Sequence, residues 1–127
     1  MNLAGLEYLN ETFDACYVIS LDDSIQRRRE TSDLLTHRGV NFEILSACDY
    51  RKKLPAEIDA DGSISHDPSL YRAEMTPAEI GCAISHRVAA QQILDRKLSS
   101  ALILEDDISI IDEHLPTFAK ALAQLPP

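Results

Sequence analysis

The chain has 127 residues, of which 45% are hydrophobic and 26% are charged. This length is sufficient for a single domain whose core is stable without disulfides or structural metals. Twelve basic residues against 21 acidic ones leave a formal net charge of -9, which argues against nucleic acid as a partner. The same charge would repel a phosphorylated ligand unless a divalent cation lay between the ligand and the protein.

The three cysteines, Cys16, Cys48 and Cys82, are widely spaced and include no C-x-x-C pair. This pattern is typical of reduced thiols in a cytoplasmic protein rather than of a disulfide framework. Residues 1–14 lack both a basic start and a continuous apolar stretch, and no apolar run reaches about 18 residues. We therefore expect a soluble, cytoplasmic protein.

The first half of the chain predicts a strand, a helix and a second strand. Ala15–Leu21 is a short β-prone run that ends at an acidic pair, as a buried parallel strand would. Ser24–Arg38 is polar and rich in helix formers, and Gly39 provides a left-handed stop. Val40–Ala47 begins with alternating apolar and polar residues, which predicts the second strand.

A long connection and a well-marked helix start follow. Residues 54–75 contain two prolines and the turn-prone pair Asp61-Gly62, so we expect an irregular connection with a small hairpin at that pair. The next helix should begin at Thr76, which can cap the free amides. Pro77 then occupies the first helical position, and Glu79 can complete a capping box.

The spacing of Ile80, Ile84 and Val88 predicts that this helix packs inward through these side chains and continues to about Lys97. Residues 101–104, ALIL, predict a buried strand that runs into three acids, and a last helix should begin after residue 112. The order of elements predicts an α/β fold with a mostly parallel sheet flanked by helices. Ligands of such sheets bind at the carboxyl ends of the strands.

Three successive acids, Glu105, Asp106 and Asp107, follow the last predicted strand. They would repel one another unless they were solvated or joined by a cation, and hard divalent ions prefer carboxylate oxygens. Strand alternation should point Glu105 and Asp107 to one side and Asp106 to the other, which gives an acid-x-acid geometry. Both a magnesium or manganese site and a solvated strand exit fit this pattern.

Other polar residues leave similar alternatives. Asp22-Asp23 and the arginines of residues 27–29 could receive a phosphate or ribose, or simply face water. Ser85 and His86 are neighbours on a helix and point about 100° apart, which argues against a hydrolytic dyad. Cys82 and His86 share a helix face, where packing is a more common role than zinc binding for a lone pair.

Taken in order, YVISLDDSIQRR, MTPAEIGCAISHRVAAQQIL and ALILEDDISI resemble the motifs of glycosyltransferase family 25, whose bacterial members act in lipooligosaccharide biosynthesis. The helix motif of the family is matched from Glu79 to His86, and its acidic motif from Leu104 to Asp107. The sequence departs from the family at Ser20, where asparagine is usual, and at Asp23, where a basic residue is common.

The resemblance implies a GT-A type fold that is Rossmann-like and binds a nucleotide sugar, here UDP-galactose, with Mn²⁺ or Mg²⁺. It implies that Asp107 coordinates the metal and that Glu105 contacts the metal or the ribose. Asp106 would belong to the same donor site. The resemblance also implies that Asp22, Arg27 and Arg28 lie near the nucleotide. The resemblance names no catalytic residue, and His86 is a candidate beside the alternative of a buried hydrogen-bonding residue.

Family members are about twice as long as this chain, so we expect residues 1–127 to form one domain that is the donor-binding half of a glycosyltransferase. The acceptor would be a lipooligosaccharide, and the enzyme would work at the cytoplasmic face of the inner membrane. The face left by the missing half could drive self-association. The alternative is a non-catalytic relative that binds a nucleotide sugar or a protein partner.

Overall fold

The computed structural model describes residues 5–62 and 75–126. The elements in chain order are α1 (Leu9–Thr12), β1 (Ala15–Ser20), α2 (Ile25–His37), β2 (Glu43–Ser46), η1 (Tyr50–Lys52), α3 (Pro55–Asp59), α4 (Pro77–Asp95), β3 (Ala101–Glu105), η3 (Asp112–His114) and α5 (Leu115–Leu122), where η1 and η3 are 3-10 helices. The predicted α/β order is confirmed, with β2 shorter than expected.

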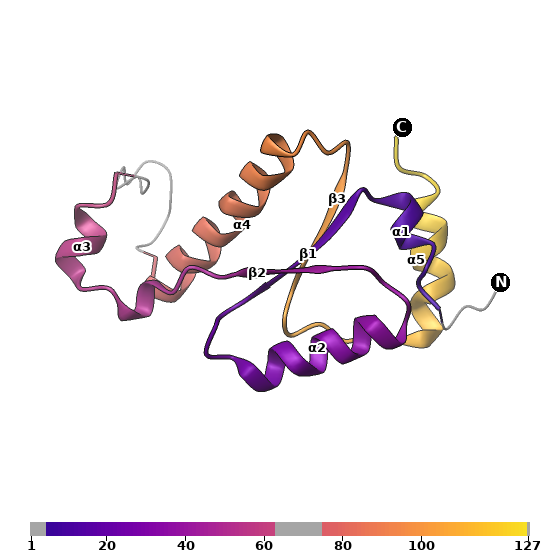
Figure 1. Ribbon diagram of the computed structural model, residues 1–127, viewed down its shortest axis with the longest axis horizontal. Coiled ribbons are helices and arrows are strands. Elements are labelled where there is room, and N and C mark those ends of the chain that lie inside the picture. The colour runs from indigo at the N-terminus through magenta and orange to yellow at the C-terminus, as the bar shows by residue number, and fades with distance from the viewer. Residues whose placement is uncertain (1–4, 63–74, 127) are drawn as a thin grey trace.

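The three strands form one parallel sheet in the order β2-β1-β3. Because the chain crosses from β1 to β2 and later returns past β1 to β3, right-handed crossovers put α2 and α4 on opposite sides of the sheet (Figure 1). The strand order therefore reverses between β1 and β3. In parallel α/β sheets this reversal opens a crevice at the carboxyl ends of the two strands, where ligands bind.

The central strand β1 is buried along nearly its whole length. Residues 16–20 are all buried, and Val18 is completely inaccessible. A continuous apolar run is what a strand covered on both faces needs. Burying a side chain such as Leu35, which packs into the same core, contributes about 1.5–3 kcal/mol. The buried core cluster consists of Leu6, Leu9, Cys16, Val18, Leu35, Val40 and Leu115.

Helix α2 ends where the sequence predicts. Gly39 has a φ of 78°, a left-handed conformation that favours glycine. The amide of Val40 then donates to the carbonyl oxygen of Leu35 at 3.0 Å, which satisfies one of the last carbonyl groups of the helix. This stop turns the chain toward β2.

The connection after β2 is more regular than predicted, because it contains η1 and α3. Pro55 occupies the first position of α3, and Glu57 Oε2 accepts a hydrogen bond from the amide of Leu54 at 2.9 Å. These signals resemble those at the start of α4, although no helix was predicted at this position. The hairpin expected around Asp61-Gly62 would extend into residues 63–74, which lie outside the described residues.

The start of α4 is confirmed in detail. Thr76 Oγ1 accepts from the amide of Glu79 at 3.3 Å, and Glu79 Oε2 accepts from the amide of Thr76 at 3.2 Å. The predicted inward face of this helix is wrong, however. Gly81, Ser85 and Ala89 are its buried residues, whereas Val88 is exposed.

The buried side chains of α4 are small because the helix packs closely against another segment of the chain. A Cβ atom on Gly81 would lie 2.5 Å from the carbonyl oxygen of Cys48, so the helix backbone approaches the segment after β2 very closely. Ser85 Oγ fills this contact by accepting from the amide of Cys48 at 2.8 Å and donating to the carbonyl oxygen of Gly81 at 2.7 Å. Isoleucine or valine would be too large here.

The last helix, α5, begins after residue 112 as predicted and buries Leu115. None of the helices in the described part of the chain has the length and apolar character that crossing a membrane requires.

Candidate functional site

A cleft of about 160 Å³ lies at the carboxyl ends of the strands, between β1, β3, α4 and the segment that follows β2. Its charged lining residues are Arg27, Asp49, Arg51, Glu105 and Asp106. The cleft therefore coincides with the reversal of strand order, where the sequence predicted a ligand site.

Asp106 is the buried member of the acidic motif, with 7% of its side chain exposed. The register that pairs Ile19 with Glu105 sets Asp106 beside Ser20, whose hydroxyl donates to Asp106 Oδ2 at 2.7 Å. Arg27 Nη2 lies 2.8 Å from Asp106 Oδ1, and Thr31 Oγ1 donates to the backbone oxygen of Asp106 at 2.8 Å. Asp106 thus ties the end of β3 to β1 and α2.

Glu105 faces helix α4 instead. Its Oε1 atom lies 2.9 Å from His86 Nε2 and 3.6 Å from Cys82 Sγ. The hydrogen bond with His86 is the main reason that the pKa of Glu105 lies below its usual value. The carboxylate form of Glu105 is therefore favoured, while 45% of its side chain remains exposed.

Asp107 is the most open of the three acids, with 62% of its side chain exposed. Its Oδ2 atom lies 3.6 Å from Arg27 Nη2. A buried Asp106 between two more exposed acids agrees with the alternation expected for a strand end. The burial thus separates Asp106 from Glu105 and Asp107.

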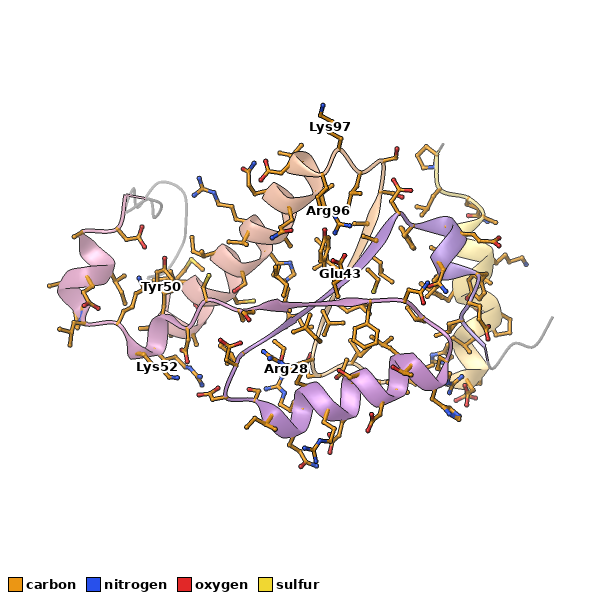
Figure 2. All side chains as sticks on the ribbon, viewed as in Figure 1. Arg28, Glu43, Tyr50, Lys52, Arg96 and Lys97 are labelled. Carbon is orange, nitrogen blue, oxygen red and sulfur yellow. The ribbon has the colours of Figure 1, made fainter. Side chains whose placement is uncertain are left out.

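The acidic residues after β1 are held by their neighbours. Arg28 Nη2 donates to the backbone oxygen of Ser20 at 2.9 Å and to Asp22 Oδ1 at 3.0 Å, reaching from α2 toward the strands (Figure 2). Ser46 Oγ donates to the same Asp22 oxygen at 2.7 Å. The hydrogen bond from Ser46 is the main cause that lowers the pKa of Asp22, and the one from Arg28 is the next largest. Asp22 and Arg28 do not line the cleft.

His86 does not line the cleft itself but contacts Glu105, which does. It is not the buried residue that one alternative predicted, because 43% of its side chain is exposed. Ser85 is engaged with the backbone of Cys48, so the two neighbours form no dyad. Cys82 is exposed rather than packed inside. The pKa of the Cys82 thiol is nevertheless raised, mainly because the thiol is partly desolvated and secondly because of the negative charge of Glu105.

Two cleft residues, Asp49 and Arg51, were missed as site candidates. Arg51 binds Asp49 through two contacts of 2.8 Å, from Nε to Oδ1 and from Nη2 to Oδ2. This hydrogen bonding lowers the pKa of Asp49 to about 2. The basic run of residues 51–53 was the available signal, but only the packing of η1 against α4 brings Arg51 to the cleft.

The sequence profile of glycosyltransferase family 25, described as LPS biosynthesis protein, matches residues 13–125. The chain belongs to glycosyltransferase family 25. It is 30% identical over 80% of its length to the lipooligosaccharide biosynthesis protein lic2B of Haemophilus influenzae. It is 34% identical over 76% of its length to a glycosyltransferase 25 family member of Drosophila pseudoobscura pseudoobscura. The procollagen galactosyltransferase 1 of Danio rerio is 27% identical over 76% of the chain.

This family 25 chain is much shorter than these relatives. The matched region spans 36% of the Haemophilus protein and 16% of the Drosophila and Danio proteins. No solved structure matches the chain significantly.

Proposed function

We propose that the cleft binds a nucleotide diphosphate sugar and that the chain supplies the donor-binding part of a glycosyltransferase. One observation carries this proposal. In a chain of family 25, the register of β1 and β3 brings Glu105 and Asp106 to the reversal of strand order, and both residues line the cleft there. Sites at this position of an α/β sheet commonly bind nucleotides.

Glu105 and Asp107 are the residues that we propose to hold Mn²⁺ or Mg²⁺. Their carboxylate oxygens are ligands that these hard cations prefer. The fit is supported by the exposure of Asp107 and by the lowered pKa of Glu105, which keeps its oxygens ionised. When bound, such an ion would stabilise the negative charge of the departing diphosphate as a Lewis acid.

The cationic groups of the site have complementary roles in this proposal. Arg27 is half-exposed and Arg51 also lines the cleft, so both can attract the phosphates of the donor. Asp106 orients Arg27 through their 2.8 Å contact. Asp22 and Arg28 would lie near the nucleotide, where their hydrogen bonds hold the end of β1 in place.

We further propose UDP-galactose as the donor and a lipooligosaccharide as the acceptor. A galactosyltransferase and a lipooligosaccharide biosynthesis protein among the relatives support these choices. A lipid-linked acceptor would place the work at the cytoplasmic face of the inner membrane. His86, which contacts Glu105 at the cleft edge, is the proposed catalytic candidate.

Calorimetric titration of the chain with UDP-galactose, with and without Mn²⁺, tests the donor site. Binding should require the metal, and Asp107→Asn should abolish it. Asp33→Asn is the matched control, since it removes the same charge at an exposed position of α2 and should bind normally. Absent or metal-independent binding would contradict the proposal.

The alternative of a non-catalytic relative makes a different prediction for the same samples. Such a chain would bind the donor but release no UDP in the presence of acceptor. A coupled assay for UDP therefore separates donor binding from sugar transfer.

Self-association is the last part of the proposal. A groove of about 350 Å³ lies next to β3. It is lined mostly by apolar residues, which include Leu102, Leu104 and Ile108. Ile111 and Phe118 at this groove are exposed, and we propose that a second copy covers them. Light scattering at increasing concentration should detect a dimer, whereas a monomer throughout would overturn this assignment.

A further inference from the structure

Three side chains of different chemistry converge at the edge of the cleft. Cys82 and His86 lie one turn apart on α4, and Glu105 ends β3. Cys82 Sγ, His86 Nε2 and a carboxylate oxygen of Glu105 all lie within 4.8 Å of one another. The sequence places the cysteine and histidine on one helix face, but only the fold adds the carboxylate.

A nucleophilic cysteine is a poor explanation for this cluster. Activation would require the thiolate to be favoured, usually by a nearby cation or a helix amino end. Cys82 instead lies 3.6 Å from the carboxylate of Glu105, and that negative charge disfavours a thiolate. His86 is also engaged with this carboxylate rather than positioned solely to take a proton from the thiol.

Two of the three separations between these atoms lie close to those around a tetrahedral metal ion, and the third is no longer than 4.8 Å. Zinc bonds of about 2.0–2.3 Å to sulfur, nitrogen and oxygen place neighbouring ligand atoms about 3.5 Å apart. The distances from Glu105 Oε1 to His86 Nε2 and to Cys82 Sγ are 2.9 Å and 3.6 Å, which bracket this spacing. Small side-chain movements would therefore complete the three protein bonds.

We propose that Cys82, His86 and Glu105 form a site for Zn²⁺ or a similar thiophilic divalent ion. Three protein ligands leave the fourth tetrahedral position open, as in zinc sites that bind water or a substrate group. Metal binding would release the proton of the Cys82 thiol, and the resulting thiolate and the carboxylate would together balance the charge of the ion. The exposure of all three side chains leaves the site accessible from solvent.

This site differs in chemistry from the donor site. Sulfur and imidazole ligands favour zinc and cobalt, whereas Mg²⁺ and Mn²⁺ favour carboxylate oxygens. Glu105 is nevertheless shared between the two sets. One consequence rests on the proposed function: a zinc ion held here would withdraw Glu105 from the donor metal and weaken Mn²⁺-dependent binding of UDP-galactose.

Cobalt titration of the reduced chain tests the site without any donor. One equivalent of Co²⁺ should produce tetrahedral visible bands and a sulfur-to-metal charge-transfer band in the near ultraviolet. Competition with Zn²⁺ should remove both bands. The absence of a charge-transfer band would overturn the proposal, because Co²⁺ bound to Cys82 must show it.

Variants assign the band to its ligands. Cys82→Ser should abolish the charge-transfer band. His86→Gln should weaken Zn²⁺ binding by more than the roughly 10–100-fold loss that follows removal of an outer-shell partner. Cys48→Ser is the matched control, since Cys48 lines the same cleft but does not belong to the cluster. A band that survives Cys82→Ser, or that disappears in Cys48→Ser, would contradict the assignment.

Asp107→Asn separates this proposal from the donor site. The variant should keep the Co²⁺ band although it loses Mn²⁺-dependent donor binding. Loss of the band in this variant would overturn the three-residue site. Circular dichroism of each variant establishes that the fold is retained, which is expected because Cys82 and Asp107 are exposed.

Discussion

The carboxyl ends of β1 and β3 both carry acidic residues, but the two ends use them differently. At the end of β1, Asp22 is bound by Arg28 and Ser46, which are fixed on α2 and β2. At the end of β3, Glu105 and Asp107 keep about half or more of their side chains exposed. The difference lies in the partners rather than in exposure, because 74% of the Asp22 side chain is exposed. Asp22 has two close partners on α2 and β2, whereas Asp107 has, among the described residues, only a 3.6 Å contact with Arg27 and is available to a ligand.

Asp106 shows that this difference does not follow from sequence position alone. It lies within the open acidic motif, yet it is buried and bound by Ser20, Arg27 and, at its backbone, Thr31. A buried carboxylate with fixed partners, such as Asp106, holds the strands and helices together, whereas an exposed one with few partners, such as Asp107, can exchange water for a cation. Acids of the first kind should affect stability, and acids of the second kind should affect binding.

The largest expected effect is that of Asp106→Ala. This change leaves the buried hydroxyl of Ser20 without its 2.7 Å acceptor and removes the closer of the two described acidic partners of Arg27. We expect a loss of about 2–3 kcal/mol in the free energy of unfolding, because unsatisfied buried polar groups are costly. Urea denaturation measures it, and a loss no larger than that of an exposed-acid variant would refute the structural role of Asp106.

Gly81→Ala tests the close contact that shapes the same cleft from the side of α4. The new methyl group would meet the carbonyl oxygen of Cys48 at 2.5 Å, and backbone atoms must move to relieve the overlap. We expect destabilisation of about 1–3 kcal/mol despite the better helix propensity of alanine. Thermal unfolding provides the measurement, with exposed Ala83→Gly as a propensity control. Stabilisation by Gly81→Ala would contradict the packing.

Asp107→Asn sharpens the contrast with Asp106. Asp107 is mostly exposed, and its ion-pair contact with Arg27 is long at 3.6 Å. Its replacement should therefore change the free energy of unfolding by no more than about 0.5 kcal/mol. The same variant should lose metal-dependent donor binding. Parallel urea denaturation and calorimetry check both expectations, and a stability loss comparable to that of Asp106→Ala would erase the distinction between the two acids.

The smallest effect concerns Asp49 and its partner on η1. Arg51→Gln should raise the pKa of Asp49 from about 2 toward its ordinary value of 3.8, because the paired hydrogen bonds are lost. Because the pKa of Asp49 is lower in the folded chain than its ordinary value, the interaction stabilises the fold fully at pH values above 3.8. This stabilisation disappears as the pH falls toward 2. NMR titration of the Asp49 carboxyl carbon measures the shift. An unchanged titration would show that Arg51 does not hold this carboxylate.

Much of this structure follows from local sequence. The apolar run of β1, the stop at Gly39 and the capping box of Thr76 and Glu79 were all predicted, because each depends on residues within one or two turns. The acidic motif after β3 was likewise identified, as was its position at a strand end.

The tertiary structure decided which of these residues are buried and which meet. The inward face of α4 is formed by Gly81, Ser85 and Ala89, since the segment after β2 approaches too closely for the predicted apolar stripe. The partners of Glu105, His86 and Cys82, lie on a helix 19 and 23 residues earlier in the chain. Local signals determine where helices and strands begin and end, whereas contacts between distant segments determine which acids stay open to a ligand.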